Sequence, residues 1–147
     1  YVMEVTKFSF DEINMMSRLI ASRAKSENFT HILGIARGGL VPATIMSYEL
    51  DLPLITCSVS SYNGTKRNEL QVNHDIKLSQ FTKDSNLLLV DDICDTGETM
   101  QWLSNRLTLA DIKHSKACIF SKAKHIEYLS HYGSVVPDDK WIVFPWE

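Results

Sequence analysis

The residues best suited to chemistry stand in one short segment, residues 91–99, which reads Asp-Asp-Ile-Cys-Asp-Thr-Gly-Glu-Thr. Its three acids, two threonines and glycine follow an apolar run, where a buried strand is expected to give way to a helix. The first amides of a helix lack partners and attract anions. Thr96, Gly97 and Thr99 therefore suit a phosphate monoester, because glycine allows close backbone approach and the hydroxyls add uncharged donors.

Asp91 and Asp92 suit a different ligand. Two neighbouring carboxylates can accept from vicinal hydroxyls, or hold a hydrated Mg²⁺ that takes its other ligands from water and substrate. The ordinary alternative is an acidic strand end followed by a threonine N-cap with no ligand. The full set of acids, threonines and glycine at fixed offsets favours a ligand site.

The flanking elements can position this segment. Residues 86–90 form the most apolar run of the chain, which is typical of a buried parallel strand at the centre of a sheet. Residues 98–109 carry Met100, Leu103 and Leu107 at helical spacing and predict a helix. The acids therefore lie at the carboxyl end of a central strand, where open parallel sheets bind ligands.

The first third of the chain supplies another strand, turn and helix. After a short extended start, Ser9 and Glu12 form a capping box for a helix with Ile13, Met16, Ile20 and Ala24 at apolar positions. Residues 31–36 predict a strand, residues 37–39 (Arg-Gly-Gly) a turn, and residues 42–49 a helix that opens with proline.

The rest of the chain continues this alternation. Residues 54–60 predict an extended segment, residues 117–120 a strand, and residues 135–136 a shorter apolar segment. Residues 61–75 are polar and show no period, which predicts a long, mobile loop. Strands alternating with helices favour an α/β fold with a mainly parallel central sheet flanked by helices, in a single domain over residues 1–147.

The composition argues against nucleic-acid-binding and membrane-spanning proteins. The chain has 147 residues, 44% of them hydrophobic and 22% charged, as in an ordinary globular domain. The net charge of −3 gives no general attraction to nucleic acid, and no apolar run reaches the length of a membrane span. Cys57, Cys94 and Cys118 lack metal or redox spacing and indicate reduced thiols in a cytoplasmic protein.

The five histidines receive no role from the sequence. His125 and His131 lie six residues apart on a possible short helix, which is not a reliable metal spacing. His31, His74 and His114 are isolated along the chain. Surface or structural duties are the expectation for each of them.

Segment 91–99 resembles the PRPP-binding signature of type I phosphoribosyltransferases, where two acids and two variable residues precede Asp-Thr-Gly-x-Thr. Glu98 falls at the variable position. Other segments resemble, in order and spacing, the xanthine-guanine phosphoribosyltransferases of bacteria. These segments are residues 37–42, 60–62, 120–122, 141–142 and 145–146.

The resemblance implies the type I phosphoribosyltransferase fold, with a flexible loop over residues 61–75 and a small base-binding hood within residues 122–147. It implies a Mg²⁺-dependent enzyme of purine salvage that converts PRPP and a 6-oxopurine to a nucleoside 5′-monophosphate and pyrophosphate. It also implies a homo-oligomer, a dimer or tetramer, with no nucleic-acid partner. Preference among guanine, xanthine and hypoxanthine stays open.

The resemblance also assigns roles to residues. It implies that the 5′-phosphate is bound by Asp95, Thr96, Gly97, Glu98 and Thr99. Pyrophosphate is assigned to Arg37, Gly38, Gly39 and Arg67, with a cis peptide near Ala36 and Arg37 aiming the glycine amides. The ribose hydroxyls and Mg²⁺ are assigned to Asp91 and Asp92.

Asp95 resembles the family's candidate general base for N7 of the purine, or an electrostatic anchor in its place. Lys122 is expected to donate to the 6-oxo group, which would reject the amino group of adenine. Trp141 is expected to stack on the purine and the backbone of Ile142 to meet its 2-position edge. The flexible loop is expected to contribute Ser60, Ser61 and Tyr62.

Other interpretations stay open at this stage. Lys122 alone is typical of a solvated charge, Trp141 of a core residue and residues 37–39 of a simple helix-entry turn. A phosphoribosyltransferase for another base, or a PRPP or nucleotide sensor without turnover, would share the fold. A Rossmann-type redox protein is excluded because no Gly-x-Gly-x-x-Gly follows the first strand.

Overall fold

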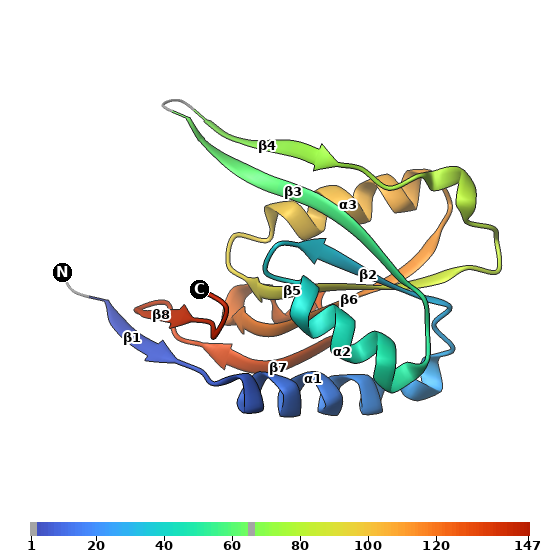
Figure 1. Cartoon of the computed structure of the whole chain (residues 1–147). Helices are drawn as coiled ribbons and strands as arrows, with labels where there is room; N and C mark the ends of the chain where they lie inside the picture. Colours follow the sequence, from blue (N-terminus) through green and yellow to red (C-terminus); the bar gives the residue numbers. More distant parts are fainter. Residues whose placement is uncertain (1–2, 65–66) are drawn as a thin grey trace.

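The computed structural model describes residues 3–64 and 67–147, with the side chains of residues 60–69 left out of the description. Within these residues, six strands form one sheet in the order β4-β3-β2-β5-β6-β7 (Figure 1). Neighbouring strands are parallel except for β3 and β4. The strands are β2 (His31–Ala36), β3 (Leu54–Gly64), β4 (Arg67–His74), β5 (Asn86–Cys94), β6 (Lys113–Lys122) and β7 (His131–Val136). The expected mainly parallel sheet is therefore confirmed.

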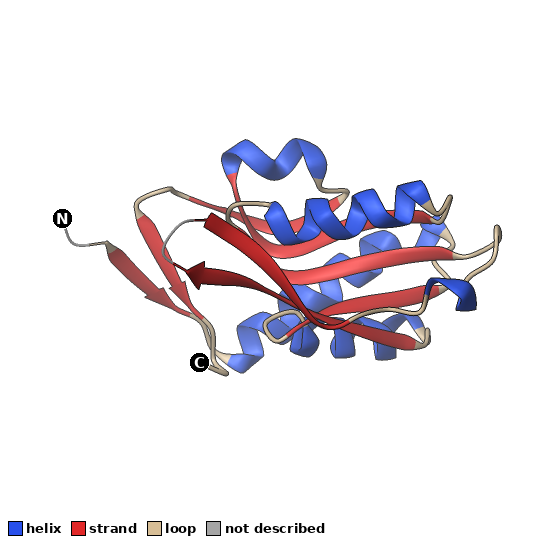
Figure 2. Cartoon of the chain, turned by 90° about the horizontal axis from the view of Figure 1, so that it is seen from above, coloured by secondary structure: helices blue, strands red, loops and turns tan. Residues whose placement is uncertain are grey.

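Helices cover both faces of this sheet. Helices α1 (Phe10–Ala24) and α2 (Leu40–Leu50) lie on one face and α3 (Glu98–Leu109) on the other (Figures 1 and 2). Alternate residues of β5 point to opposite faces of the sheet, so both faces need cover. Leu88 and Val90 pack into the core under α1 and α2. Leu87 and Leu89 point the other way and pack into the core under α3. A strand buried on both faces must read as a continuous apolar run, as this one does.

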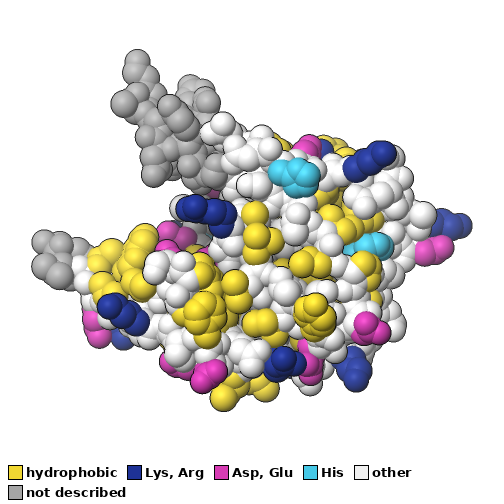
Figure 3. Space-filling view, viewed as in Figure 1, with side chains coloured by type: hydrophobic (Ala, Val, Ile, Leu, Met, Phe, Trp, Pro, Cys, Tyr) yellow, Lys and Arg dark blue, Asp and Glu magenta, His cyan; other side chains and the backbone are white. Residues whose placement is uncertain are grey.

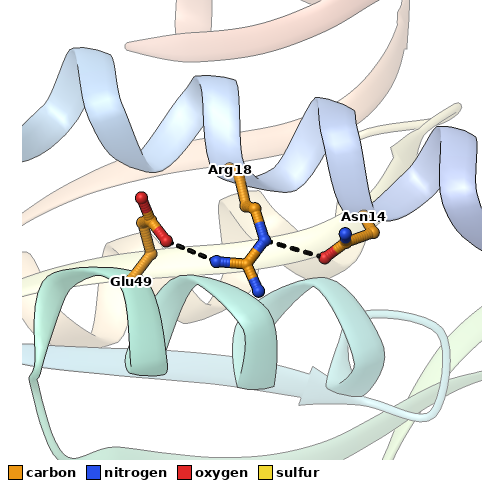
Figure 4. Close-up of polar contacts among 3 residues, drawn as sticks. All are labelled: Asn14, Arg18 and Glu49. Carbon is orange, nitrogen blue, oxygen red and sulfur yellow. Dashed lines mark hydrogen bonds and ion pairs between the residues drawn. The ribbon is translucent and has the colours of Figure 1, made fainter.

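Helix α1 begins as its sequence predicts. Ser9 accepts a hydrogen bond from the backbone N–H of Glu12, whose carboxylate accepts from the backbone N–H of Ser9 in return. On the outer surface, Arg18 donates to Asn14 Oδ1 at 3.1 Å and to Glu49 Oε2 at 2.5 Å (Figure 4). The second of these contacts joins α1 to α2.

The bounds of α3 agree with the prediction, whereas those of α2 and β6 differ from it, and strands β3, β5 and β7 are longer than predicted. Helix α3 spans residues 98–109, as predicted. Helix α2 begins at Leu40 rather than Pro42, with Gly39 at the N-cap, so the proline stands in the first turn, where its missing N–H costs nothing. Strand β6 is longer than predicted, so Lys122 is its last residue and not a loop residue after it.

The prediction of a long loop over residues 61–75 is wrong, because most of this range belongs to strands β3 and β4. The backbone of β3 continues to Gly64 and pairs antiparallel with β4, down to the Gly64–Arg67 pair. Figure 1 shows this hairpin projecting from the body of the molecule. Residues 71–75 are exposed, and an exposed stretch of strand needs no alternation of apolar residues. The sequence therefore carried no strand signal.

A second, two-stranded sheet pairs the two ends of the described chain. Strand β1 (Glu4–Lys7) runs parallel to β8 (Lys140–Val143), with Val5 opposite Trp141 and Thr6 opposite Ile142. Figure 2 shows this pair set apart from the main sheet. The predicted hood range holds β8 together with the 3₁₀ helix η3 (Ala123–Tyr128), whereas β7 belongs to the main sheet.

Candidate active site at the carboxyl ends of the strands

The glycine turn after β2 packs directly on the end of β5. A Cβ built on Gly39 would stand 2.4 Å from the carbonyl oxygen of Val90, so the two backbones touch. A Cβ built on Gly38 would stand 2.1 Å from Oδ2 of Asp92. The peptide between Ala36 and Arg37 is cis, as the resemblance implied. The turn predicted for pyrophosphate thus lies against the acids predicted for ribose, with the Arg37 side chain exposed beside it.

Asp91 and Asp92 form a partly buried pair of carboxylates. Asp91 Oδ1 accepts from the backbone N–H of Asp92 at 2.9 Å, and Asp92 Oδ1 accepts from that of Ile93 at 2.7 Å. Burial raises the pKa of Asp91, and the neighbouring charge of Asp92 raises it further. Burial also raises the pKa of Asp92. Two carboxyl groups held this close repel each other when both are ionised, and a cation or hydroxyl donors would relieve that repulsion.

The residues predicted for a phosphate line one cavity of about 210 Å³. Gly97 takes a positive φ of 78° at the N-cap of α3, a conformation that favours glycine. Thr96 Oγ1 accepts from the backbone N–H of Glu98 at 3.3 Å. The predicted residues on the cavity wall are Asp91, Asp95, Thr96, Gly97, Glu98 and Thr99. The start of α3 thus faces a space that can receive an anion.

A larger cavity of about 390 Å³ joins the site to the small sheet. Its wall includes the predicted ribose, base and catalytic residues Asp92, Asp95, Lys122, Trp141 and Ile142. Ile93 and Asp95 line both cavities. Asp95 therefore stands on the wall of both cavities.

Lys122 is not the solvated charge that a lone lysine would suggest. Its side chain is buried, and Nζ donates to the carbonyl oxygens of Pro137 at 3.1 Å and Lys140 at 3.2 Å. An ammonium has three donors, so a third remains for a group in the cavity. The two bonds also fix the position of Nζ at the carboxyl end of β6.

Trp141 and Ile142 separate into different environments. Trp141 is 53% exposed and lines the larger cavity, so it does not act as a core filler. Ile142 is buried in the core. Adjacent residues of a strand point to opposite faces, which leaves the indole as a surface that a flat ring could stack on.

The sequence missed several residues of this larger cavity. Met3, Asp138, Lys140 and Glu147 also line it, and Glu147 Oε1 accepts from the backbone N–H of Phe144 at 2.8 Å. Met3 reaches the cavity only because the start of the chain pairs with β8, and no local pattern signals that pairing. The predicted contacts from Ser60, Ser61, Tyr62 and Arg67 lie outside the described side chains.

The three cysteines are free and buried. Hydrogen bonds from Cys118 and then Ser121 lower the pKa of Cys94. Cys94 lines the cavity of about 210 Å³ at the start of α3, which is called the phosphate-sized cavity from here on. Burial raises the pKa of Cys57 to about 12. Among the described residues, no helix combines the length and apolar character that a membrane span requires.

Comparison with known proteins agrees with this geometry. The model of the phosphoribosyl transferase domain matches residues 9–147. The chain belongs to the phosphoribosyltransferase family. It is 35% identical over 142 residues to a xanthine-guanine phosphoribosyltransferase of Idiomarina loihiensis, covering 95% of this chain and 84% of the relative.

Solved phosphoribosyltransferases share the fold. A purine phosphoribosyltransferase from Pyrococcus horikoshii superimposes with a TM-score of 0.81 and 29% identity, covering 99% of this chain and 95% of that one. A xanthine-guanine-hypoxanthine phosphoribosyltransferase from Helicobacter pylori gives a TM-score of 0.83, with 98% and 94% of the two chains covered. At 21% identity, the second likeness concerns the fold alone. The expected type I phosphoribosyltransferase fold is confirmed.

Proposed function

We propose that this protein transfers the 5-phosphoribosyl group of PRPP to a 6-oxopurine in purine salvage, releasing pyrophosphate and a nucleoside 5′-monophosphate. The observation that carries the proposal is that Asp95 lines two neighbouring cavities of different character. One has a helix N-terminus suited to a phosphate. The other has a half-exposed indole and a buried ammonium suited to a flat, oxygen-bearing ring. A substrate that spans both would bring its ribose carbon to the junction.

Base selection follows from Lys122. Its remaining N–H would donate to the 6-oxo group of guanine, xanthine or hypoxanthine. Adenine offers an amino group there, so donor would face donor and the third N–H of the buried ammonium would lack an acceptor. The names of the relatives support xanthine and guanine as substrates.

Asp95 is the proposed general base. As N9 of the purine attacks the anomeric carbon of ribose and the bond to pyrophosphate breaks, the proton on N7 needs an acceptor. The exposed carboxylate of Asp95, on the wall common to both cavities, supports that role. Arg37 and the amides of Gly38 and Gly39 would stabilise the negative charge on the leaving pyrophosphate.

Mg²⁺ belongs to the same proposal, and Asp91 and Asp92 would hold it. The repulsion between them and their raised pKa values suit a divalent cation. Among the described residues, no three His, Cys, Asp or Glu side chains come together around one point, so water and substrate would complete the coordination. The bound ion would balance the charge of the pyrophosphate.

A cytoplasmic homo-oligomer, a dimer or tetramer, completes the proposal. Apolar side chains are exposed over β1 and along α1 (Figure 3), among them Val5, Phe10, Met15 and Leu19. Their exposure supports contact with a second copy.

The decisive experiment mixes the protein with Mg²⁺, PRPP and one base at a time, measuring pyrophosphate release and nucleotide formation. We expect turnover with guanine, xanthine or hypoxanthine and none with adenine or uracil. Asp95→Asn should lower kcat by about 100-fold, and Lys122→Ala should lose the preference for 6-oxopurines.

Lys113→Ala is the matched control, because Lys113 is an exposed lysine at the opposite end of β6. It should leave turnover unchanged. Turnover with adenine or uracil instead would indicate a phosphoribosyltransferase for another base. Binding of PRPP without turnover for any base would overturn the enzyme and favour a sensor of the same fold.

A further inference from the structure

The segment that faces the phosphate-sized cavity lines a second cavity as well. A separate cavity of about 270 Å³ adjoins the same segment: Cys94, Thr96 and Gly97 line both spaces, whereas His125 lines only this second one. A loop that lines two cavities has little packing to hold it in one conformation. Its shape must therefore depend on specific contacts that cross the second space.

One such contact comes from η3. Nε2 of His125 lies 2.7 Å from the carbonyl oxygen of Asp95. A carbonyl oxygen only accepts, so Nε2 carries the proton and donates. The imidazole also packs on Gly97, because a Cβ built there would stand 3.3 Å from both Cε1 and Nδ1 of the ring. His125 thus contacts the loop at two points, on either side of Thr96.

We propose that His125 is a positioning residue, which holds the Asp95–Gly97 turn so that its amides converge on the 5′-phosphate. This inference rests on the proposed function of the site. His125 does not touch the phosphate cavity and acts through the turn. The side chain also stands three residues after Lys122 on the same segment. The elements that hold the base and the phosphate are therefore linked through η3.

The geometry makes the expected effect specific. Losing the bond frees the carbonyl of Asp95 and enlarges the second cavity, so the turn samples conformations that bind phosphate poorly. The contact is made whether or not a purine is present, so its loss should weaken PRPP binding more than it slows the chemical step. The purine cavity has separate walls at Lys122 and Trp141 and should be little affected.

The test compares His125→Ala with His125→Gln, whose amide nitrogen can donate to the same carbonyl. We expect His125→Ala to raise KM for PRPP about tenfold, the worth of roughly one net hydrogen bond. Its KM for the purine should stay within about twofold, because Lys122 and Trp141 belong to other walls of the purine cavity. His125→Gln should restore most of the PRPP affinity. His114→Ala is the control, because His114 also contacts a backbone carbonyl, that of Ile112, away from the site.

A second measurement does not depend on turnover. Ribose 5-phosphate, titrated calorimetrically into each variant, reports the phosphate site alone, and thermal unfolding reports the folded state. Weaker binding in His125→Ala than in His125→Gln, at equal melting temperature, supports the inference even if no base is converted. Equal binding by wild type, His125→Ala and His125→Gln would overturn it and leave the proposed enzyme standing. Equal loss in both variants would also overturn it, because the donated hydrogen bond would then be irrelevant.

Discussion

The carboxylate of Asp92 rests against the α-carbon of Gly38, so that a Cβ on Gly38 would stand 2.1 Å from Oδ2 and 2.4 Å from Cγ. The turn after β2 and the end of β5 come together through this contact. No Cβ fits between them unless the carboxylate moves. Glycine is required here for space and not for its backbone angles, because Gly38 is not among the described residues with a positive φ.

The neighbouring glycines should respond differently to substitution by alanine. In Gly38→Ala the new methyl meets a side chain, so Asp92 should turn away, with a loss of about 100-fold in kcat/KM and a small change in stability. In Gly39→Ala it meets the carbonyl oxygens of Val90 and Ile35, at 2.4 and 2.7 Å, which belong to strands and cannot move freely. We expect a loss of about 2 to 3 kcal/mol in the free energy of unfolding.

Urea unfolding and steady-state kinetics on both variants check this contrast. Equal destabilisation by the two alanines would show that the Asp92 carboxylate is as fixed as the backbone. Normal activity in Gly38→Ala would separate Asp92 from the reaction.

The central elements were readable from sequence because their causes are local. The apolar run of β5, the capping box at Ser9 and Glu12, and the spacing in α3 each act within a few residues. The phosphate-sized cavity was predictable for the same reason, since residues 91–99 supply most of its wall. Residues that are adjacent in the sequence and line one cavity can be recognised together as one motif.

The remaining features depend on distant partners. The pairing of β1 with β8 joins residues 4–7 to residues 140–143 through strands of four residues each, which are too short to carry a distinctive pattern. The two carbonyls that bind Lys122 come from the turn before β8 and its first residue, which no spacing encodes. His125 likewise meets Asp95 from thirty residues away.

Asp91→Asn should stabilise the protein without ligands while reducing its activity. Burial and the charge of Asp92 raise the pKa of Asp91 in the folded state, whereas the unfolded chain titrates near the ordinary value of about 4. Stability from this group is therefore complete below about pH 4 and is lost as pH rises through the raised folded pKa. Asparagine removes the charge and still accepts from the backbone N–H of Asp92.

Thermal unfolding at pH 7 should therefore show a melting temperature roughly 3 °C higher in the variant. The gain should shrink toward pH 4, and turnover should fall because the ribose hydroxyls and cation lose a carboxylate. A lower melting temperature at pH 7 would mean that the Asp91 charge is already compensated in the folded protein.

Cys94 should be the most reactive of the three thiols toward a reagent such as iodoacetamide. Its pKa is lowered chiefly by a hydrogen bond from Cys118, and it lines the phosphate-sized cavity, whereas burial raises the pKa of Cys57 to about 12. At pH 7 we expect its rate to exceed the others by about tenfold. Peptide mapping by mass spectrometry measures this.

Ribose 5-phosphate should protect Cys94, and Cys118→Ala should slow its reaction by removing the donor. Cys94→Ser is the control, since it should abolish the fast reaction. Unchanged labelling with the phosphate present would contradict the assignment of this cavity.

The end of β4 is tied to α3 by an ion pair between Asp75 and Arg106. Asp75 also accepts from the backbone N–H of Ile76 at 2.8 Å, and the Arg106 guanidinium lies over the Trp102 ring at 4.9 Å. The hydrogen bond from Arg106 lowers the pKa of Asp75. A lowered folded pKa gives stability that is present above the unfolded value of about 4 and is lost as pH falls through the folded one.

Both side chains reach solvent, so the ion pair should contribute only modestly to the free energy of unfolding. In a double-mutant cycle of Asp75→Asn and Arg106→Gln, we expect a coupling of about 0.5 kcal/mol in the free energy of unfolding at pH 7. It should fall in 1 M NaCl, because salt screens exposed charges, and it should fall in acid as the pH drops through the lowered pKa of Asp75. Urea unfolding at each condition measures the coupling. If the coupling persisted unchanged in high salt and in acid, an interaction other than the pairing of opposite charges would link Asp75 to Arg106.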